Sequence, residues 1–262
     1  MTVQISAVLI TFNEESNIAD AIGSVKWADE ILVVDSGSTD GTREIAADLG
    51  ARVIERAWPG FSAQKQFAVD SASHDWVFSL DADERVSKEL ADSIESVRRS
   101  NASADGYSIS RLPYYMGRPI RHGGWYPDPH VRLFDRRKGK WKDTIIHESV
   151  EMAAGTRVEK LSGELLHYTV RNVSEHHRMI GERYAPLSAE QMFAEGRRSN
   201  AINAASASAG AFLKSYILKR GFLDGYPGFC IAWFAAHNAF LKHSLLIEKY
   251  ARESGSNETP AS

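Results

Sequence analysis

The sequence predicts an α/β protein with a mostly parallel, Rossmann-like sheet, flanking helices and a helical C-terminal extension. Short apolar runs rich in β-branched residues alternate with helical patterns through the first hundred residues, and the connections between them are short. This alternation is typical of parallel sheets, because consecutive parallel strands are joined by crossover helices. We interpret residues 5–10, 31–34, 53–54 and 76–80 as strands, and residues 13–25, 42–49, 61–71 and 87–99 as helices.

Local signals support these elements in turn. Asn13 is a suitable N-cap, and the acids Glu14 and Glu15 after it suit the positive end of a helix dipole. Gly50 stands where the second helix should stop, because glycine readily takes the left-handed conformation of a C-terminal cap. The fourth apolar run passes directly into the acidic stretch 81–84, which is typical of a buried parallel strand that reaches its carboxyl end.

Length and composition indicate an ordinary globular protein. The 262 residues suffice for one large domain with an appendage, and 43% of them are hydrophobic and 25% charged. The single cysteine, Cys230, excludes an internal disulfide. The start, Met-Thr-Val-Gln, lacks the basic region of a signal peptide, and the longest apolar run, residues 229–236, falls short of the roughly 20 residues that span a bilayer. We therefore expect a cytoplasmic protein.

Charge is distributed unevenly along the chain. Residues 1–170 contain 20 basic and 26 acidic side chains, a net charge of −6, whereas residues 171–252 contain 11 basic and 6 acidic side chains, a net charge of +5. The remaining tail contributes −2 to the total of −3. A basic C-terminal third favours an anionic partner, although a solvated surface has the same pattern.

Three polar segments follow predicted strands, namely residues 11–15, 35–41 and 81–84. Parallel strands bring their carboxyl ends to one edge of the sheet, where α/β proteins bind ligands. Asp81 and Asp83 flank one small residue, so a tight turn would bring both carboxylates near one point. A magnesium or manganese ion that carries phosphate oxygens would relieve their repulsion. An isolated Asp-x-Asp is more often a solvated turn, so this interpretation depends on the other two segments.

The three segments contain recognisable motifs: Thr-Phe-Asn-Glu-Glu, Val-Asp-Ser-Gly-Ser-Thr-Asp-Gly-Thr and Phe-Ser-Leu-Asp-Ala-Asp-Glu. In this order and spacing they resemble the family 2 inverting glycosyltransferases of the GT-A fold, and more narrowly the lipopolysaccharide-core β-1,4-glucosyltransferase group. The chain has neither the phosphate loop of NTPases nor the Gly-x-Gly-x-x-Gly of dinucleotide enzymes. The resemblance implies a UDP-sugar donor and a Mg²⁺ or Mn²⁺ cofactor.

The resemblance also implies roles for individual residues at the donor site. Thr11, Asn13 and Glu15 would border the base and ribose, and Ser38 would belong to the same site. Asp35 would hydrogen-bond the uracil, and Lys65 matches a basic residue near the nucleotide, for which a solvated helix lysine is the alternative. Asp81 would contact the ribose or the hydration shell of the metal, and Asp83 would ligate the metal.

An acceptor half is predicted after residue 100. Residues 1–170 would form the glycosyltransferase domain, with residues 1–100 as the nucleotide-sugar half and 101–170 as the acceptor half. A loop over residues 113–129 is rich in glycine, proline, aromatic residues and arginine. Aromatic rings stack on sugars and arginine binds anionic groups, so Trp125, Tyr126 and Arg132 are the candidate acceptor residues.

Inverting transfer needs a general base for the acceptor hydroxyl and a Lewis acid for the leaving diphosphate. Glu148, in the segment 145–150, is the candidate base, and Asp143 is the alternative. Many members of the family carry the base in an acid pair that this chain lacks, so the choice between them stays open. His147 is a candidate metal ligand or diphosphate contact, with a purely structural histidine as the alternative.

The C-terminal third is predicted to be helical over residues 174–195, 211–220 and 229–252, with an Ala/Ser-rich linker or exposed loop at 199–210. Residues 171–252 would form a helical region and 253–262 a disordered tail. Apolar stripes beside lysines predict peripheral contact with anionic membrane at the inner face of the cytoplasmic membrane, near a lipid-linked acceptor. The alternative is that these helices cover a sheet face or form a homodimer interface.

Three functions remain from the sequence alone. The first is a metal-dependent glycosyltransferase that acts on a saccharide or glycolipid acceptor. The second is a nucleotidyltransferase, which would need a basic glycine-rich loop where residues 11–15 are acidic. The third is a non-catalytic nucleotide-sugar or carbohydrate-binding module, against which the intact Asp81 and Asp83 argue. We expect no nucleic-acid partner.

Overall fold

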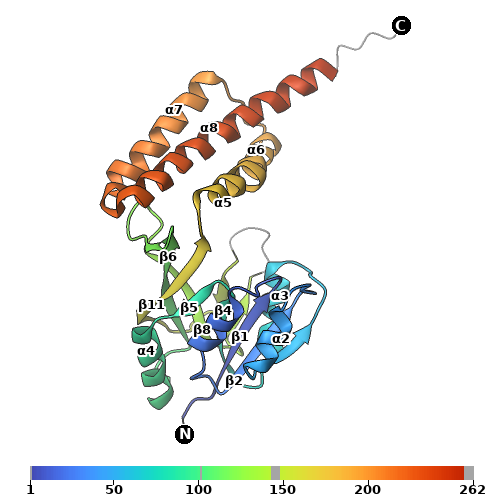
Figure 1. Cartoon of the computed structure of the whole chain (residues 1–262), viewed down its shortest axis with the longest axis vertical. Helices are drawn as coiled ribbons and strands as arrows, with labels where there is room; N and C mark the ends of the chain where they lie inside the picture. The colour runs from blue at the N-terminus through green and yellow to red at the C-terminus, as the bar shows by residue number, and fades with distance from the viewer. Residues whose placement is uncertain (1, 101, 143–147, 257–262) are drawn as a thin grey trace. The chain divides into compact units, whose positions relative to one another are not determined.

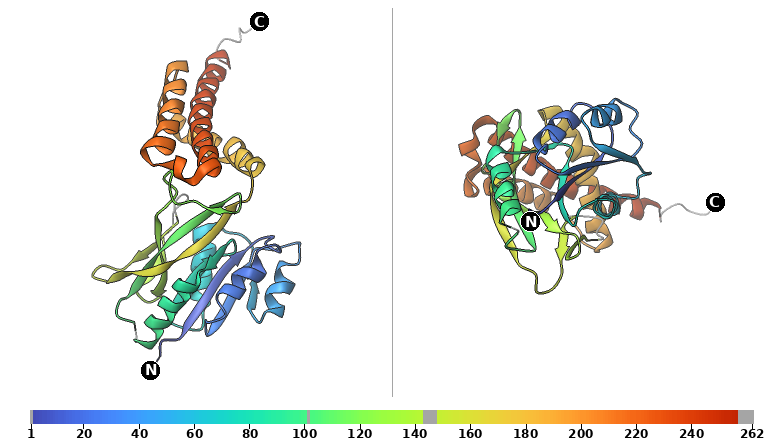
Figure 2. Two further views of the ribbon diagram at one scale, coloured as in Figure 1. Left: turned by 60° about the vertical axis from the view of Figure 1, so that its left-hand side comes forward. Right: turned by 90° about the horizontal axis from the view of Figure 1, so that it is seen from below.

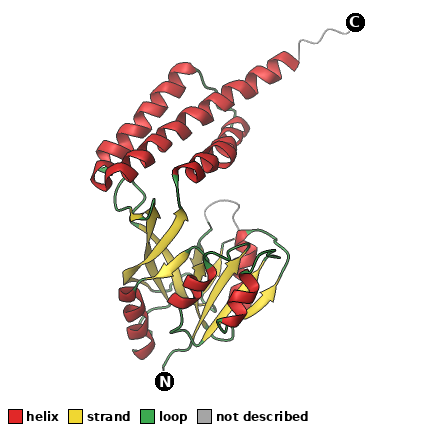
Figure 3. Ribbon diagram, in the orientation of Figure 1, coloured by secondary structure: helices red, strands yellow, loops and turns green. Residues whose placement is uncertain are grey.

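The computed structural model describes residues 2–100, 102–142 and 148–256 of the chain, which divides into two compact units. The first unit comprises residues 1–112 and 127–168 and contains a large sheet with flanking helices (Figure 1). The second comprises residues 113–126 and 169–262 and is mainly helical (Figure 3). The division at residue 170 expected from the sequence stays a prediction of domain organisation.

The N-terminal half of the first unit is the predicted alternation of strands and helices. Strands β1 (Ile5–Thr11), β2 (Glu30–Asp35), β3 (Arg52–Glu55) and β4 (Trp76–Asp81) are parallel, in the spatial order β3-β2-β1-β4. Helices α1 (Ile18–Ser24), α2 (Thr42–Asp48) and α3 (Phe61–Asp70) make the crossovers. The predicted α/β class and the parallel order of these strands are therefore confirmed.

Antiparallel strands extend this sheet beyond β4. The order continues through β8 (Asp128–Asp135), β6 (Gly106–Tyr115), β11 (Val158–Val170) and β5 (Glu84–Val86), while β7 (Arg118–Pro119) pairs with β6. Strands β9 (Gly139–Trp141) and β10 (Val150–Met152) form a separate hairpin. The residues predicted as a loop over 113–129 thus include the end of β6, all of β7 and the start of β8. Strand β11 was not predicted.

Helices lie against the sheet (Figure 2), and each face of the sheet has an apolar core. Ala7 and Leu9 of β1 belong to the core that contains α1, α2 and α4 (Lys88–Arg99), whereas Val8 belongs to the core that contains α3. Successive strand residues point to opposite faces, so a strand covered on both sides is apolar throughout. This explains why the strand signals of the sequence were continuous apolar runs.

Gly163 lets β11 approach the first turn of α4. Its φ is +87°, a conformation that other residues rarely adopt, and a Cβ atom there would collide with the backbone of Leu90. Ser87 caps α4 by accepting a hydrogen bond from the Leu90 amide, and the same hydroxyl accepts one from the amide of Glu164 in β11. The cap and the glycine together fix β11 against α4.

The predicted N-cap at Asn13 is wrong. Helix α1 begins at Ile18, and Asn13 has a φ of +54° instead of a capping conformation. Its amide donates to Ser38 Oγ at 2.8 Å, and its side-chain oxygen accepts from the amide of Thr39 at 2.8 Å. Asparagine tolerates the left-handed region and bonds readily to nearby backbone, so it serves here as a tie between two loops.

The helices of the second unit follow one another with few breaks. Helix α5 (Val173–Arg178), the π-helix η1 (Met179–Tyr184) and α6 (Ala185–Ala194) cover the predicted helix 174–195. The π turn directly precedes Pro186, whose missing amide removes one helical hydrogen bond and favours a wider turn. Helix α8 (Gly225–Ser256) contains the predicted helix 229–252.

The predicted linker at 199–210 is also wrong. It forms most of α7 (Ala201–Leu213), which packs along α8, with the π-helix η2 (Lys214–Leu218) and the 3-10 helix η3 (Gly221–Asp224) joining the two (Figure 1). The Asn200 side chain accepts from the Asn203 amide and starts the helix, and alanine has the highest helix propensity. Across the described parts of the chain, no helix combines the length and the apolar character that crossing a bilayer requires.

Candidate active site

The predicted strand ends meet at one edge of the sheet. Thr11 at the end of β1 is in register with Asp35 at the end of β2, and Ile10 is in register with Asp81 at the end of β4. The loops that follow these three ends carry the sequence motifs. The carboxyl edge of the parallel strands is therefore the candidate active site, as expected for an open α/β sheet.

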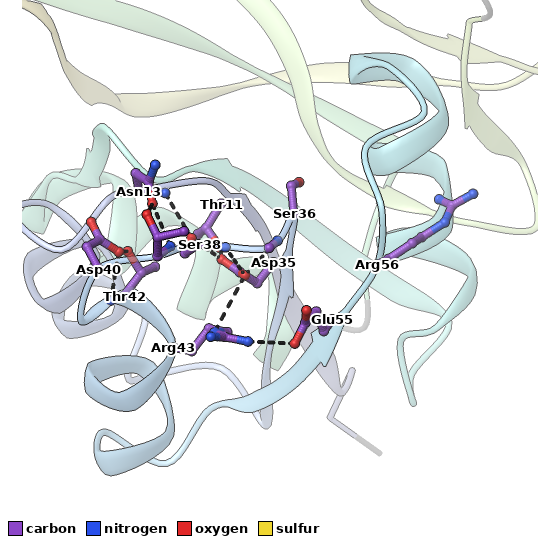
Figure 4. A network of polar contacts seen from close by, with 12 residues as sticks. Thr11, Asn13, Asp35, Ser36, Ser38, Asp40, Thr42, Arg43, Glu55 and Arg56 are labelled. Carbon is purple, nitrogen blue, oxygen red and sulfur yellow. Dashed lines mark hydrogen bonds and ion pairs between the residues drawn. The ribbon is translucent and has the colours of Figure 1, made fainter.

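Asp35 organises the loop that follows β2 (Figure 4). One of its oxygens accepts from the amides of Gly37 and Ser38 at 3.0 and 2.8 Å, and the other accepts from the hydroxyls of Thr11 and Ser38 at 2.9 and 2.5 Å. The side chain is 0% exposed, with Arg43 Nε 3.9 Å from Oδ1. The hydrogen bond to uracil that the resemblance implied would require Asp35 to exchange one of these partners.

A second set of contacts ties the loop after β1 to the start of α2 (Figure 4). The amide of Glu14 donates to Thr42 Oγ1 at 2.8 Å, and the carboxylate of Glu15 accepts from the amide of Gly41 at 3.2 Å. Asp40 in turn accepts from the Thr42 hydroxyl and from the amide of Glu15. Thr11, Asn13, Glu15, Asp35 and Ser38 are thus brought together in one hydrogen-bonded structure.

Asp81 lies between two buried cations. Lys65 Nζ from α3 is 2.7 Å from Oδ1, and Arg132 Nη2 from β8 donates to Oδ2 at 3.1 Å. Lys65 is 7% exposed and Arg132 is 2% exposed. Burial opposes ionisation, but the charges of Lys65 and Arg132 outweigh it and hold the pKa of Asp81 well below its usual range. Asp81 is therefore a permanent anion whose oxygens both have protein partners.

The third acceptor candidate, Arg132, is buried beside the acidic turn. An acceptor contact needs an accessible side chain, but Arg132 is buried and its Nη2 also donates to Glu84 Oε1 at 2.8 Å. Glu84 is 0% exposed and its second oxygen accepts from the amide of Asp81. Arg132 thus ties β8 to the acidic turn, and its predicted role toward an acceptor stays a prediction.

A polar network continues from Glu84 along the antiparallel strands. Arg111 of β6 lies 3.9 Å from Glu84 and donates to Asp128 Oδ2 through two nitrogens at 2.8 and 2.5 Å. His130 Nε2 is 2.8 Å from the other oxygen of Asp128. Burial acts in the opposite direction, but the hydrogen bond with His130 and the charge of Arg111 lower the pKa of Asp128. Asp128 and His130 are both partly exposed at this edge.

Asp83 is the carboxylate that retains capacity for a ligand. Among the described residues its side-chain ion pair is with His167 of β11, whose Nε2 is 3.2 Å from Oδ2. Burial lowers the pKa of His167, but the hydrogen bond and charge of Asp83 outweigh it and raise that pKa. The Asp83 side chain is 27% exposed, and its backbone oxygen accepts from the amide of Tyr168. The turn is thus anchored while the carboxylate stays accessible.

The donor set at Asp83 is compatible with a divalent cation. No group of three or more His, Cys, Asp and Glu side chains within the described ranges could hold a metal ion. Magnesium and manganese ions bound to a nucleotide take most of their ligands from phosphate and water. One carboxylate with a neighbouring imidazole therefore provides enough protein ligands. Asp81 is less suited, because a metal would displace Lys65 or Arg132 from it.

The candidate base Glu148 lies at the β9–β10 hairpin and is partly buried. The hairpin pairs Trp141 with Val150, and the amide of Lys142 donates to the oxygen of Ser149. Lys65 Nζ is 4.8 Å from the centroid of the Trp141 ring, so the hairpin touches a residue of the Asp81 group. The alternative base Asp143 and the candidate ligand His147 fall outside the described residues.

The two aromatic acceptor candidates belong to the second unit. Trp125 is partly buried, with its ring 6.0 Å from Tyr115 and 5.8 Å from His176. Arg121 lies over the ring of Tyr126 at 5.3 Å. Their role toward an acceptor stays a prediction.

Sequence reasoning placed Glu84 in the acidic turn without giving it a role, and it assigned no role at this edge to four further residues: Arg111, Asp128, His130 and His167. Asp128 and His130 had a usable signal, because residues two apart on a strand share a face. His167 had none, since its position depends on the pairing of β11 with β5, more than 70 residues earlier in the chain.

Comparison with known proteins agrees with this geometry. Residues 6–162 match the model of the family described as glycosyl transferase family 2. An uncharacterised glycosyltransferase of Rickettsia typhi is 32% identical over 257 residues, which cover 94% of this chain and 87% of that protein. The lipopolysaccharide core biosynthesis glycosyltransferase LpsC of Rhizobium meliloti is 29% identical over 259 residues, or 97% of this chain and 95% of that protein.

A solved structure with a partial match is glucosyl-3-phosphoglycerate synthase from Mycobacterium tuberculosis in complex with Mn²⁺, UDP and glucosyl-3-phosphoglycerate. It is 26% identical, with a TM-score of 0.34, and the match covers 44% of this chain and 45% of that one. The family match spans more than half of this chain, and the similarity to the Rickettsia protein spans nearly all of it. The chain therefore belongs to glycosyl transferase family 2 and is a glycosyltransferase with the GT-A type of fold.

Proposed function

We propose that this glycosyltransferase transfers a sugar, with inversion, from a UDP-sugar to a saccharide acceptor, and that the acceptor is a lipid-linked glycan such as the lipopolysaccharide core. The observation that carries the proposal is the meeting of the Asp35 loop with Asp81, Asp83 and Lys65 at one carboxyl edge. The name of LpsC, which is similar over nearly the whole chain, supports the choice of acceptor. The protein would work at the inner face of the cytoplasmic membrane.

The donor would bind along the loops after β1 and β2. Thr11, Asn13, Glu15 and Ser38 would border the base and ribose, on a loop whose conformation Asp35 maintains from within. Asp81, kept ionised by its two cations, would accept hydrogen bonds from the ribose or from metal-bound water. Lys65 would act through Asp81, since its ammonium group is already paired with that carboxylate.

Asp83 would hold the divalent cation, with His167 beside it and His147 as a further ligand. The cation, when bound, supplies positive charge that stabilises the departing diphosphate. Neutralising Asp83 in this way would also loosen its ion pair with His167. That imidazole would then be available to donate a hydrogen bond to the diphosphate.

Glu148 would take the proton of the acceptor hydroxyl as that oxygen attacks the anomeric carbon, and the bond to the diphosphate breaks. A carboxylate suits this step if it lies within hydrogen-bond reach of the hydroxyl in the bound complex. Asp143 is the alternative base. Glu148→Gln and Asp143→Asn distinguish them, because the variant that lacks the base should retain UDP binding and lose turnover by about 100-fold or more.

The first experiment is a calorimetric titration of UDP with and without Mn²⁺, on the wild type and Asp83→Ala. We expect binding that depends on the metal and that is lost in the variant. Asp92→Ala is the matched control, because Asp92 is an exposed carboxylate on α4 whose ion pair is with the exposed Lys88. A screen of UDP-sugars against lipopolysaccharide-core acceptors would then identify the substrates. If UDP bound neither with metal nor without it, the uridine donor would be excluded.

A further inference from the structure

The joint between α7 and α8 exposes an unusual amount of apolar surface. We call residues 213–229, which include η2, η3 and the first turn of α8, the tip. Seven large apolar side chains of the tip are between 40% and 77% exposed. They are Leu213, Ile217, Leu218, Phe222, Leu223, Tyr226 and Phe229. A contiguous exposed apolar patch on a globular protein usually marks a contact surface.

The tip is held in this conformation by hydrogen bonds to His122 and Gly123 and by ring contacts of its own. The Asp224 carboxylate accepts from the amide of His122 at 2.8 Å and lies 2.8 Å from His122 Nδ1, and the amide of Gly123 donates to the oxygen of Lys219. Tyr216 has ring contacts with Phe222 at 6.2 Å and Phe229 at 5.8 Å. The apolar side chains are therefore presented by an ordered scaffold.

The backbone at the centre of the tip is strained. Arg220 has a φ of +56°, which costs free energy for a residue other than glycine. Gly221 and Gly228 approach so closely that a Cβ atom on Gly228 would collide with the oxygen of Gly221. Strain that is maintained by surrounding contacts is a feature of functional segments.

The charge of the tip selects the kind of partner. Lys214, Lys219 and Arg220 are exposed, and none of them has an ion pair with an acidic side chain in the described part of the chain. The only acid within the tip, Asp224, is engaged by His122. Three cations among leucine, isoleucine and aromatic side chains match a surface that is apolar inside and anionic at its boundary.

We propose that the tip inserts into the interfacial layer of a membrane that contains anionic lipid. Leucine, isoleucine and phenylalanine side chains would enter the acyl boundary, Tyr226 would lie at headgroup level, and the three cations would contact lipid phosphates. The inference rests on the lipid-linked acceptor proposed above and specifies which element reaches the membrane. A second copy of this chain is the competing occupant of the same apolar surface.

The test measures vesicle binding separately from catalysis, by cosedimentation of the full chain. One set of vesicles is phosphatidylcholine alone, and the other contains about one third phosphatidylglycerol. We expect binding only to the anionic vesicles, reduced strongly at about 1 M salt, because screening weakens headgroup contacts. Lys214→Glu should lower the affinity about tenfold, since it reverses one of three charges at the surface.

The apolar contribution is tested by a matched pair of substitutions. Leu218 in the tip and Ile202 on α7 are both 77% exposed, so Leu218→Gln and Ile202→Gln remove equally accessible apolar groups. Leu218→Gln should lower vesicle affinity at least fivefold, and Ile202→Gln should leave it unchanged. Equal effects of the two substitutions, or no vesicle binding by the wild type, would overturn the proposal.

Two further readouts separate this inference from its alternatives. Light scattering of the wild type and of Leu218→Gln reports the oligomeric state, and conversion of a dimer to a monomer by Leu218→Gln would assign the tip to self-association instead. Titration of UDP with Mn²⁺ should be the same for both proteins. If the wild type bound anionic vesicles but not UDP, the proposed donor would be refuted and the proposed membrane contact would stand.

Discussion

Asp81 is the residue on which the electrostatics of the donor site depend. Its oxygens are divided between Lys65 at 2.7 Å and Arg132 at 3.1 Å, and both cations are at least nine-tenths buried. Charges fixed in a site of low polarity act without solvent reorganisation when a ligand arrives. The sequence identified Asp81 by its motif, whereas the burial of Lys65 could not be read from a helix pattern that also suits a solvated lysine.

The Lys65–Asp81 ion pair should contribute far more to stability than a surface pair of the same length. Lys88 and Asp92 are also 2.7 Å apart, but their side chains are 89% and 67% exposed. Lys65→Met should lower the free energy of unfolding by about 2–3 kcal/mol, less than a fully orphaned charge because Arg132 remains. Lys88→Met should change it by less than about 0.5 kcal/mol. Urea denaturation measures both, and similar values would show that Lys65 does not stabilise Asp81.

At the scale of elements, local sequence signals located the parallel strands and most helices. They failed for strands whose formation depends on pairing with segments far away in the sequence. Strands β1 to β4 are buried on both faces and so produced clear apolar runs. β11 contains Gly163 and several charged residues, and its partner β5 has only three residues, so neither had a periodic signal. The candidate site reflects this division: its motif residues were found, whereas Arg132 was the one residue of β6, β8 and β11 that the sequence singled out.

Glu30 joins three elements at the end of the parallel sheet opposite the candidate site. From the start of β2 its carboxylate accepts from Ser6 of β1 at 2.5 Å, from Arg52 of β3 at 2.7 Å, and from the amide of Ser73 before β4 at 2.6 Å. Burial raises the pKa of Glu30, but these hydrogen bonds outweigh it and lower that pKa from 4.5 to about 2. The ionised carboxylate is therefore part of what aligns the strands.

Glu30→Gln should destabilise the protein in a manner that depends on pH. A lowered pKa in the folded state stabilises above the pKa of the unfolded state, and this contribution is lost as the pH falls from about 4.5 to about 2. At neutral pH the free energy of unfolding of the wild type should exceed that of Glu30→Gln by up to about 3 kcal/mol, and this difference should disappear toward pH 2. Denaturant titrations across this range measure it, with Glu44→Gln on the exposed surface of α2 as the control. A gap that did not change with pH would show that packing, not charge, causes the loss.

At the scale of the whole molecule, the two units differ in the titratable groups that they bury: ionised carboxylates in the first and a neutral histidine in the second. The first unit buries carboxylates that are paired with cations, so acid weakens it by protonating them. The second unit buries His176 as a neutral ring against Tyr115 and Phe234, at centroid distances of 5.3 and 4.3 Å. Burial lowers the pKa of His176 from 6.5 to about 4. Each unit therefore has its own dependence on pH.

As the pH is lowered, the helical unit should begin to lose stability at a higher pH than the sheet unit does. The unfolded chain binds a proton at His176 below about pH 6.5, whereas the folded chain does so only near pH 4, so the contribution of the neutral ring is lost between these values. The full effect of such a shift is about 3 kcal/mol. Hydrogen exchange of peptides from α5 and from β1, corrected for intrinsic rates, would follow the two units separately.

His176→Gln should remove most of the dependence of α5 on pH between 6.5 and 4, whatever its effect on absolute stability, because glutamine does not titrate. The adjacent His177 is exposed, so His177→Gln should leave that dependence intact. Since Glu30 and His176 lie in different units, their effects in a double variant should add within about 0.5 kcal/mol. A wild-type pH response of α5 in His176→Gln would mean that another group controls the helical unit. Coupling well above this limit would mean that the two sites interact energetically.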